Sequence, residues 1–110
     1  MTDQTTTVAE IKKHIRDFCD ARNWRKGENA KDLAMALSVE AAELLEIFTW
    51  LHSDSADTVK EKAEELEHLR EELADVFWYL CRLCEHFNID LAKAVKDKAV
   101  KNAQKYPLEG

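Results

Sequence analysis

Two pairs of acidic residues stand out in this sequence because each pair lies in an apolar segment. The first pair is Glu40 and Glu43, in residues 33–51, a segment whose only charged residues are glutamates. The second pair is Glu72 and Asp75, which has the same i, i+3 spacing. Residues three apart on a helix lie on one face, so each pair presents two carboxylates side by side. Carboxylates on the buried side of a helix destabilise the fold unless a positive charge meets them.

A divalent cation shared by the two pairs would remove this repulsion. Four carboxylates at close range cannot all stay ionised unaided, so at least one would hold a proton. All-oxygen ligands favour a hard ion such as Mg²⁺, for which Mn²⁺ is the usual substitute, and such an ion completes its shell with water and substrate phosphates. The residues therefore predict a metal site, although an isolated acidic pair at this spacing usually decorates a solvated helix face.

Helical periodicity indicates how these carboxylates would be held. In the first segment an apolar stripe recurs at helical spacing and comprises Leu37, Ala41, Leu44, Phe48 and Leu51. Glu40 lies inside this stripe, Glu43 lies at its edge, and Glu46 points away toward solvent. Glu72 flanks the apolar stripe of a second helix, and Asp75 lies further round on the same side. Antiparallel packing of the two helices would bring the two pairs together.

The sequence predicts four helices joined by short polar loops. Their expected extents, in chain order, are residues 8–24, 33–52, 58–87 and 91–105. Thr7 and Glu10 fit a capping box at the start of the first helix. Asp32 and Asp90 are expected to cap the second and fourth helices, and Pro107 to end the fourth.

Four helices without a strand pattern predict an all-α fold, a four-helix bundle formed by one domain over residues 1–110. Hydrophobic residues make up 45% of the chain, which is enough for a core at this length. Residues 1–6 are polar and are expected to form a disordered N-terminus. The second and third helices are apolar over wide arcs, more than one small bundle can cover, so we expect a homo-oligomer, either a dimer or a tetramer.

Composition excludes several classes of partner. The net charge of −6 argues against nucleic acid, because phosphate contacts need clustered Lys and Arg. No stretch reaches 18 apolar residues, and the N-terminus lacks the apolar segment of a signal peptide, so no membrane partner is expected. Three cysteines without an export signal indicate free thiols in a cytoplasmic protein.

Two further motifs have metal-ligand spacing but are incomplete. Cys81 and Cys84 form a C-x-x-C with His86 two residues beyond. Haem attachment needs a histidine directly after the second cysteine, and a zinc site needs a second ligand pair. Glu65 and His68 form one E-x-x-H unit, whereas a di-iron bundle needs two such units and two more carboxylates. We therefore expect buried thiols and a solvated His68.

The acidic pairs and their surroundings resemble a known family. Residues 40–50 and 71–80 resemble the E-x-x-E…E-x-x-D signature of the all-α nucleoside triphosphate pyrophosphohydrolases, which are MazG-like, and within them the branch of the dCTP pyrophosphatases. A K-x-x-x-N-x-x-K/R-Y-P tail is matched by Lys98, Asn102, Lys105, Tyr106 and Pro107. The resemblance runs from about residue 8 to residue 107.

This resemblance implies a reaction and a set of site residues. Members hydrolyse a nucleoside triphosphate between its α- and β-phosphates, which releases a monophosphate and pyrophosphate. Carried over to this chain, Glu40, Glu43, Glu72 and Asp75 would bind Mg²⁺, and Glu43 is the suggested general base. The resemblance also implies substrate-binding residues, namely Lys98, Asn102 and Lys105 near the phosphates and sugar, and Tyr79, Trp50 and Trp24 around the base.

The preferred base is left open by one departure from the family pattern. The dCTP-specific relatives often carry a W-x-x-F-H-x-P-x-N stretch. The matching residues 24–32 have Glu28 at the His position and Asp32 at the Asn position. We expect a deoxynucleoside triphosphate, with dCTP as the first expectation and dATP or a modified base as alternatives.

Two other functions fit the same residues. An enzyme of this fold could act on another nucleotide, such as a phosphoribosyl-ATP or dUTP. Alternatively, the chain could be a non-catalytic helical interaction module whose acidic pairs bind a basic partner. An enzyme for house-cleaning of the nucleotide pool should bind a divalent cation, whereas the interaction module should not.

Overall fold

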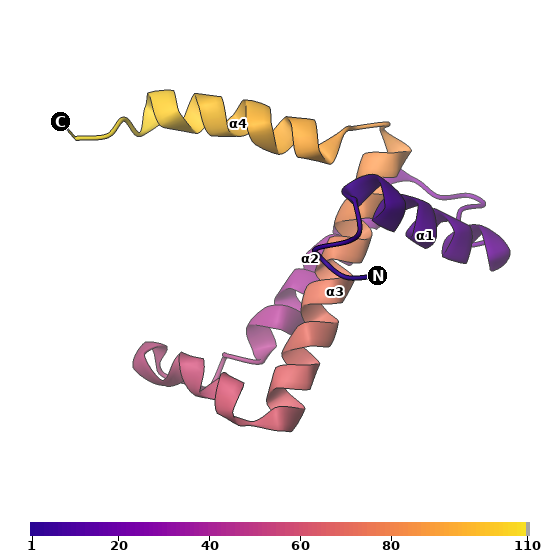
Figure 1. Ribbon diagram of the computed structural model, residues 1–110. Coiled ribbons are helices and arrows are strands. Elements are labelled where there is room, and N and C mark those ends of the chain that lie inside the picture. Colours follow the sequence, from indigo (N-terminus) through magenta and orange to yellow (C-terminus); the bar gives the residue numbers. More distant parts are fainter. Residues whose placement is uncertain (110) are drawn as a thin grey trace.

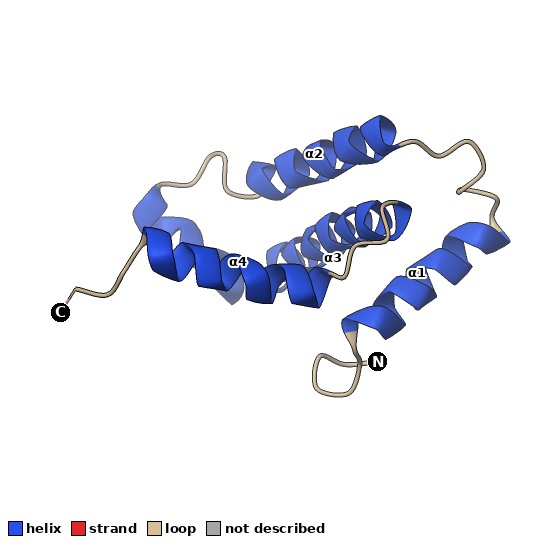
Figure 2. Ribbon diagram, turned by 90° about the horizontal axis from the view of Figure 1, so that it is seen from above, coloured by secondary structure: helices blue, strands red, loops and turns tan. Residues whose placement is uncertain are grey.

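The computed structural model describes residues 1–109, and its regular structure over that range is entirely helical (Figures 1 and 2). The elements are α1 (Val8–Ala21), α2 (Ala30–Glu46), the 3-10 helix η1 (Ser53–Glu61), α3 (Ala63–His86) and α4 (Leu91–Lys105). The predicted all-α class is confirmed. Among the described helices, none is both long enough and apolar enough to cross a membrane.

The packed part of the chain is built on an antiparallel hairpin. Figure 1 shows α2 and α3 side by side, with η1 at the turn between them, and α1 crossing the far end of α3. Ile15 and Cys19 of α1 and Cys81 of α3 form a buried apolar cluster, against which Phe77 and Trp78 pack. This contact fixes α1 against α3 at the end of the hairpin away from η1.

The three cysteines are free and buried, as the sequence predicted. Cys19 and Cys81 are fully enclosed in the cluster between α1 and α3. Burial raises the pKa of the Cys81 thiol to about 11, with a smaller contribution from Cys84. The Cys81 thiol therefore stays protonated at neutral pH and packs as a small apolar side chain.

The first two helices begin at caps that satisfy their free backbone N–H groups. Thr7 and Glu10 form the predicted capping box at the start of α1. The N-cap of α2 is Asn29, where Asp32 was expected, because the Asn29 side chain accepts a hydrogen bond from the Asp32 backbone at 2.9 Å. α1 ends at Ala21, earlier than predicted, and the chain then reverses through Asn23 in the left-handed region (φ 57°).

The connection between α2 and α3 differs most from the prediction. α2 ends as an α-helix at Glu46, and residues 53–61, assigned partly to the third helix by the sequence, form η1. The Thr58 hydroxyl donates to the Ser55 carbonyl at 2.7 Å, and the Ser55 hydroxyl donates to the His52 carbonyl at 3.1 Å. These bonds span three residues, which favours tight 3-10 turns over a continuous α-helix. Val59 is buried and anchors the segment.

Both ends of the chain lie outside the α2–α3 hairpin. Residues 2–6, expected to be disordered, form a turn in which the Thr6 backbone donates to the Thr2 carbonyl at 3.0 Å. Asp90 caps α4 as predicted, accepting from the Lys93 backbone at 2.9 Å. α4 extends away from the other helices (Figure 1), and residues 92–105 are exposed. The fourth helix thus stands apart from the three that pack together.

Candidate functional site

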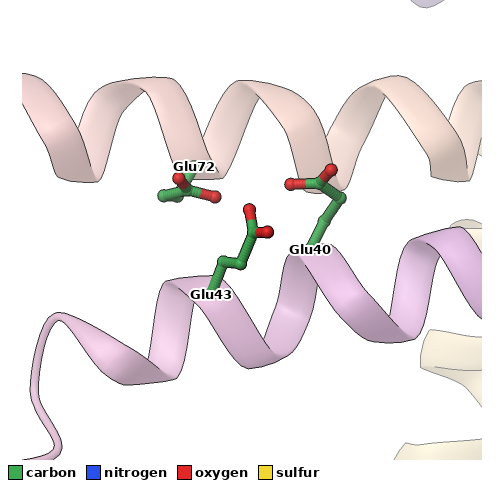
Figure 3. A group of neighbouring side chains, drawn as sticks. All are labelled: Glu40, Glu43 and Glu72. Carbon is green, nitrogen blue, oxygen red and sulfur yellow. The ribbon is translucent and has the colours of Figure 1, made fainter.

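Three of the four predicted carboxylates meet between α2 and α3. Glu40 and Glu43 of α2 and Glu72 of α3 each place a carboxylate oxygen within 4.8 Å of the others. Figure 3 shows the three side chains pointing into the space between the two helices, with their carboxylates facing one another. We call this group the acidic cluster. The antiparallel hairpin positions it, because the i, i+3 pair on α2 faces α3 along the packed seam.

The acidic cluster contains polar atoms that the described residues leave unpaired. Oε2 of Glu40 and Oε2 of Glu72 are buried and have no hydrogen-bond partner among these residues. Glu72 as a whole is only 8% exposed. A buried carboxylate without a partner is strongly destabilising, and its oxygens are the ligands that hard divalent cations prefer. The donor set therefore fits a divalent cation held between the helices.

The pKa of Glu40 also indicates that the cluster is suited to a cation. Burial raises the pKa of Glu40 to about 7, assisted by a hydrogen bond with Glu43 and by the negative charges of Glu43, Asp75 and Glu72. Without a cation, Glu40 therefore holds a proton over part of the neutral range. The sequence predicted that at least one carboxyl of this group would do so.

Asp75 is set apart from the acidic cluster. It is exposed, and it does not belong to the group of oxygens that lie within 4.8 Å of one another. Its charge nevertheless contributes to the raised pKa of Glu40. Asp75 has a shorter side chain than the glutamates and lies nearly one turn along α3 from Glu72, so its role as a ligand stays a prediction.

His68 is exposed to solvent, as the sequence predicts, and it also contacts the cluster. Its Nε2 lies 3.2 Å from Oε1 of Glu72, while its side chain is 56% exposed. Its i, i+4 spacing from Glu72 could have indicated this contact, because residues four apart on a helix are neighbours.

A hollow of about 300 Å³ lies along the same seam, beside the acidic cluster. Its lining includes Ala36, one turn before Glu40, and Tyr79, one turn after Asp75. Trp24 also lines it, so two of the three aromatic residues predicted around the base lie at one place. We call it the aromatic hollow.

The third predicted aromatic residue, Trp50, lies on the other side of the cluster. It is 92% exposed and lines a separate, open hollow of about 540 Å³ together with Glu46, Glu65 and His68. Within one chain, Trp50 is therefore not brought to the aromatic hollow.

The predicted substrate residues of α4 are also distant from the acidic cluster of their own chain. Lys98 and Asn102 line a shallow depression on α4 with Ala94, Val95 and Ala99. Lys105 is exposed near the end of this helix. Figure 1 shows α4 leaving the end of α3 in a direction away from the hairpin, and all three residues are exposed.

The fold and the cluster together define an all-α protein whose central helical hairpin carries a seam of carboxylates suited to a divalent cation. Comparison with known proteins makes this class specific. The chain belongs to the MazG-like family, whose model matches residues 35–110. The resemblance inferred from the acidic motifs is thereby confirmed.

Individual relatives agree with this membership. The chain is 32% identical to dCTP pyrophosphatase 1 of Rattus norvegicus and of Homo sapiens, over 93% and 92% of its length. It spans about 60% of the length of these curated relatives. A solved pyrophosphatase from Archaeoglobus fulgidus superposes with a TM-score of 0.82 at 37% identity, covering 98% of this chain and 99% of that one.

The raised pKa of Glu40 predicts how stability depends on pH without metal. Between pH 4.5 and about 7 the folded state keeps a proton on Glu40 that the unfolded state releases. The free energy of unfolding should therefore fall as pH rises through this interval and level off above pH 7. Urea denaturation in EDTA, comparing wild type with Glu40→Gln, should show this fall reduced in the variant.

Glu46→Gln is the matched control for this comparison, because Glu46 lies on the same helix but is exposed. Its unfolding curve should keep the wild-type dependence on pH. Identical pH dependence in wild type and Glu40→Gln would contradict the raised pKa.

Proposed function

We propose that this chain is a nucleoside triphosphate pyrophosphohydrolase that uses Mg²⁺ to hydrolyse a deoxynucleoside triphosphate to the monophosphate and pyrophosphate. The observation that carries the proposal is the pair of buried, unpaired carboxylate oxygens on Glu40 and Glu72 beside a hollow with aromatic walls. The names of the relatives, dCTP pyrophosphatase 1 and a pyrophosphatase, support the same reaction. Such an activity would serve house-cleaning of the nucleotide pool.

The acidic cluster would hold the metal, with Asp75 as the fourth carboxylate. Mg²⁺, or Mn²⁺ in its place, offsets the charge of the phosphates and orients the triphosphate when bound. Glu43 would accept the proton of the attacking water, because its side chain is partly accessible, whereas Glu72 is buried. The raised pKa of Glu40 makes that residue the poorer choice for a base that must start ionised near neutral pH, until a cation lowers that pKa.

The aromatic hollow would take the base. Its volume of about 300 Å³ lies at the lower end of the range for small-molecule sites. Trp24 and Tyr79 would contact the base through their rings, which tolerate any base, whereas hydrogen bonds to its edge would choose among bases. We keep dCTP as the first expectation, with dATP or a modified base as alternatives.

The residues of α4 would act on the site of a second copy. This helix carries five lysines and one aspartate, while the rest of the chain is strongly acidic. Lys98, Asn102 and Lys105 cannot serve their own acidic cluster from the position of α4 in Figure 1, but a homo-oligomer, a dimer or a tetramer, would let them approach a partner's phosphates. Trp50 is also exposed, so in a homo-oligomer it too could reach the site of a second copy.

Pyrophosphate release tests the proposed reaction. The protein would be incubated with a panel of dNTPs and NTPs in Mg²⁺, and then with the same nucleotides in EDTA. We expect pyrophosphate and a monophosphate from at least one dNTP in Mg²⁺ and none in EDTA, because unscreened carboxylates would repel the triphosphate. A folded protein that releases pyrophosphate from no nucleotide would contradict the proposal.

Charge-removing variants test the assignment of the carboxylates. Glu43→Gln and Asp75→Asn should each lower kcat at least about 100-fold, because the first loses the proposed base and the second a proposed ligand. Glu46→Gln is the matched control on α2 and should stay within about 3-fold of wild type, since surface substitutions have small effects. Circular dichroism would show that all three variants remain helical.

The rates of the site variants and of the control variant test different parts of the assignment. Near-normal rates for both Glu43→Gln and Asp75→Asn would refute the site assignment. A loss in Glu46→Gln as large as that in Glu43→Gln would show that the functional face of α2 is wrongly placed.

A further inference from the structure

A partly buried ionic network at the loop between α1 and α2 is not used by the proposed hydrolysis. An NH2 nitrogen of Arg82 donates to Oε1 of Glu28 at 3.0 Å, and Nδ1 of His86 lies 3.2 Å from Oε2 of Glu28. The side chains of Glu28 and Arg82 are only 11% and 12% exposed. The network joins a loop residue to two residues of α3 that lie more than 50 positions later in the chain.

The two contacts fix the carboxylate of Glu28 at both of its oxygens. The backbone beside it is also constrained, because Gly27 takes a left-handed conformation (φ 78°) and Asn29 caps α2. Glu28 therefore presents hydrogen-bond acceptors at a defined place and, as a carboxylate, has no donor to offer.

Arg82 is also held in place, and it offers hydrogen-bond donors where Glu28 offers acceptors. The same NH2 nitrogen lies 3.5 Å from the carbonyl oxygen of Trp24, and the guanidinium carbon lies 5.5 Å from the centre of the Tyr79 ring. Among the described residues its Nε has no hydrogen-bond partner. A guanidinium offers five N–H donors and no acceptor, so Arg82 adds a donor beside the acceptor of Glu28.

Glu28 and Arg82 both line the aromatic hollow with Trp24 and Tyr79. A base in the aromatic hollow would meet an acceptor next to a donor. Cytosine and adenine carry an amino donor next to a ring-nitrogen acceptor on their pairing edges. Uracil and hypoxanthine carry a carbonyl oxygen next to an N–H, which is the reverse order.

We infer that Glu28, held by Arg82 and His86, is a specificity-determining residue that makes this hollow select amino-bearing bases against their keto counterparts. The inference rests on the proposed function, since it assigns the hollow to the base of the nucleotide. A keto base would set its carbonyl oxygen against the carboxylate and leave an N–H facing the guanidinium. Both the repulsion and the lost hydrogen bonds would weaken its binding.

Matched nucleotide pairs test the inference, because each pair differs only in the amino or keto group. The pairs are dCTP with dUTP and dATP with dITP, and kcat/KM is measured from pyrophosphate release in Mg²⁺. Wild type should favour the amino member of both pairs by about 10-fold or more, the size expected from one mismatched hydrogen-bonding edge. In Glu28→Gln the preference should fall to within about 3-fold, since an amide offers both a donor and an acceptor.

Glu85→Gln is the matched control. Glu85 lies on the same helix as Arg82 and forms an ion pair with Arg16 at 3.0 Å, but it does not line the aromatic hollow. Loss of this ion pair should leave the amino preference at its wild-type value. An equal loss of preference in Glu85→Gln would refute a specific role for Glu28.

Binding measurements separate this inference from the proposed reaction. Calorimetry with dCMP against dUMP, and with dAMP against dIMP, should show the same preference in wild type without any hydrolysis. Tighter binding of the amino nucleotides without pyrophosphate release would support the inference and contradict the hydrolase. Equal affinity and equal kcat/KM for both members of each pair in wild type would overturn the inference even if Glu28→Gln failed to fold. Retention of the full preference in a folded Glu28→Gln protein would overturn it as well.

Discussion

The repulsion among the carboxylates in the α2–α3 seam is the constraint on which the other features depend. Packing of the hairpin brings Glu40, Glu43 and Glu72 to one place, and it buries oxygens of Glu40 and Glu72 without hydrogen-bond partners. The same burial and repulsion raise the pKa of Glu40. A fold keeps such a feature where a ligand relieves it, because residues selected for stability alone would fill the seam with apolar side chains.

The residues around the seam hold α1 and the following loop in place beside the aromatic hollow. The cluster of Ile15, Cys19 and Cys81 fixes α1 against α3, and this holds the following loop beside the aromatic hollow. The ion pair between Glu28 and Arg82 also holds that loop to α3. The hollow lies next to the acidic cluster on the same seam, so a base and its phosphates can be held by adjacent parts of one hairpin.

Much of this arrangement could be predicted from local patterns in the sequence. The placement of Glu40 and Glu43 on one face of α2 follows from their i, i+3 spacing, and the cap at Thr7 follows from its capping box. Features that depend on long-range contacts could not be predicted. Nothing in the sequence near Glu28 indicates that it binds Arg82, and helical periodicity does not show that α4 leaves the hairpin.

The smaller differences between the predicted and observed helices have local physical causes. Asn29 and Asp32 are both good capping residues, and only the structure shows which of them caps α2. η1 replaces the predicted start of α3 because hydroxyl groups in residues 53–58 bond to carbonyls three residues back. His68 lies on the solvated face that its charged neighbours indicate, and its contact with Glu72 is an additional feature of the i, i+4 spacing.

Direct measurement of Mn²⁺ binding tests most clearly whether the seam holds a divalent cation. The protein, first freed of metal with EDTA and dialysed, would be titrated with Mn²⁺ and followed by calorimetry and by electron paramagnetic resonance. We expect saturable binding in wild type and in Glu46→Gln, and at least about a tenfold loss of affinity in Glu72→Gln, which removes a buried ligand. Equal Mn²⁺ affinity in wild type and Glu72→Gln, or no saturable binding by the folded wild-type protein, would contradict a metal site between α2 and α3.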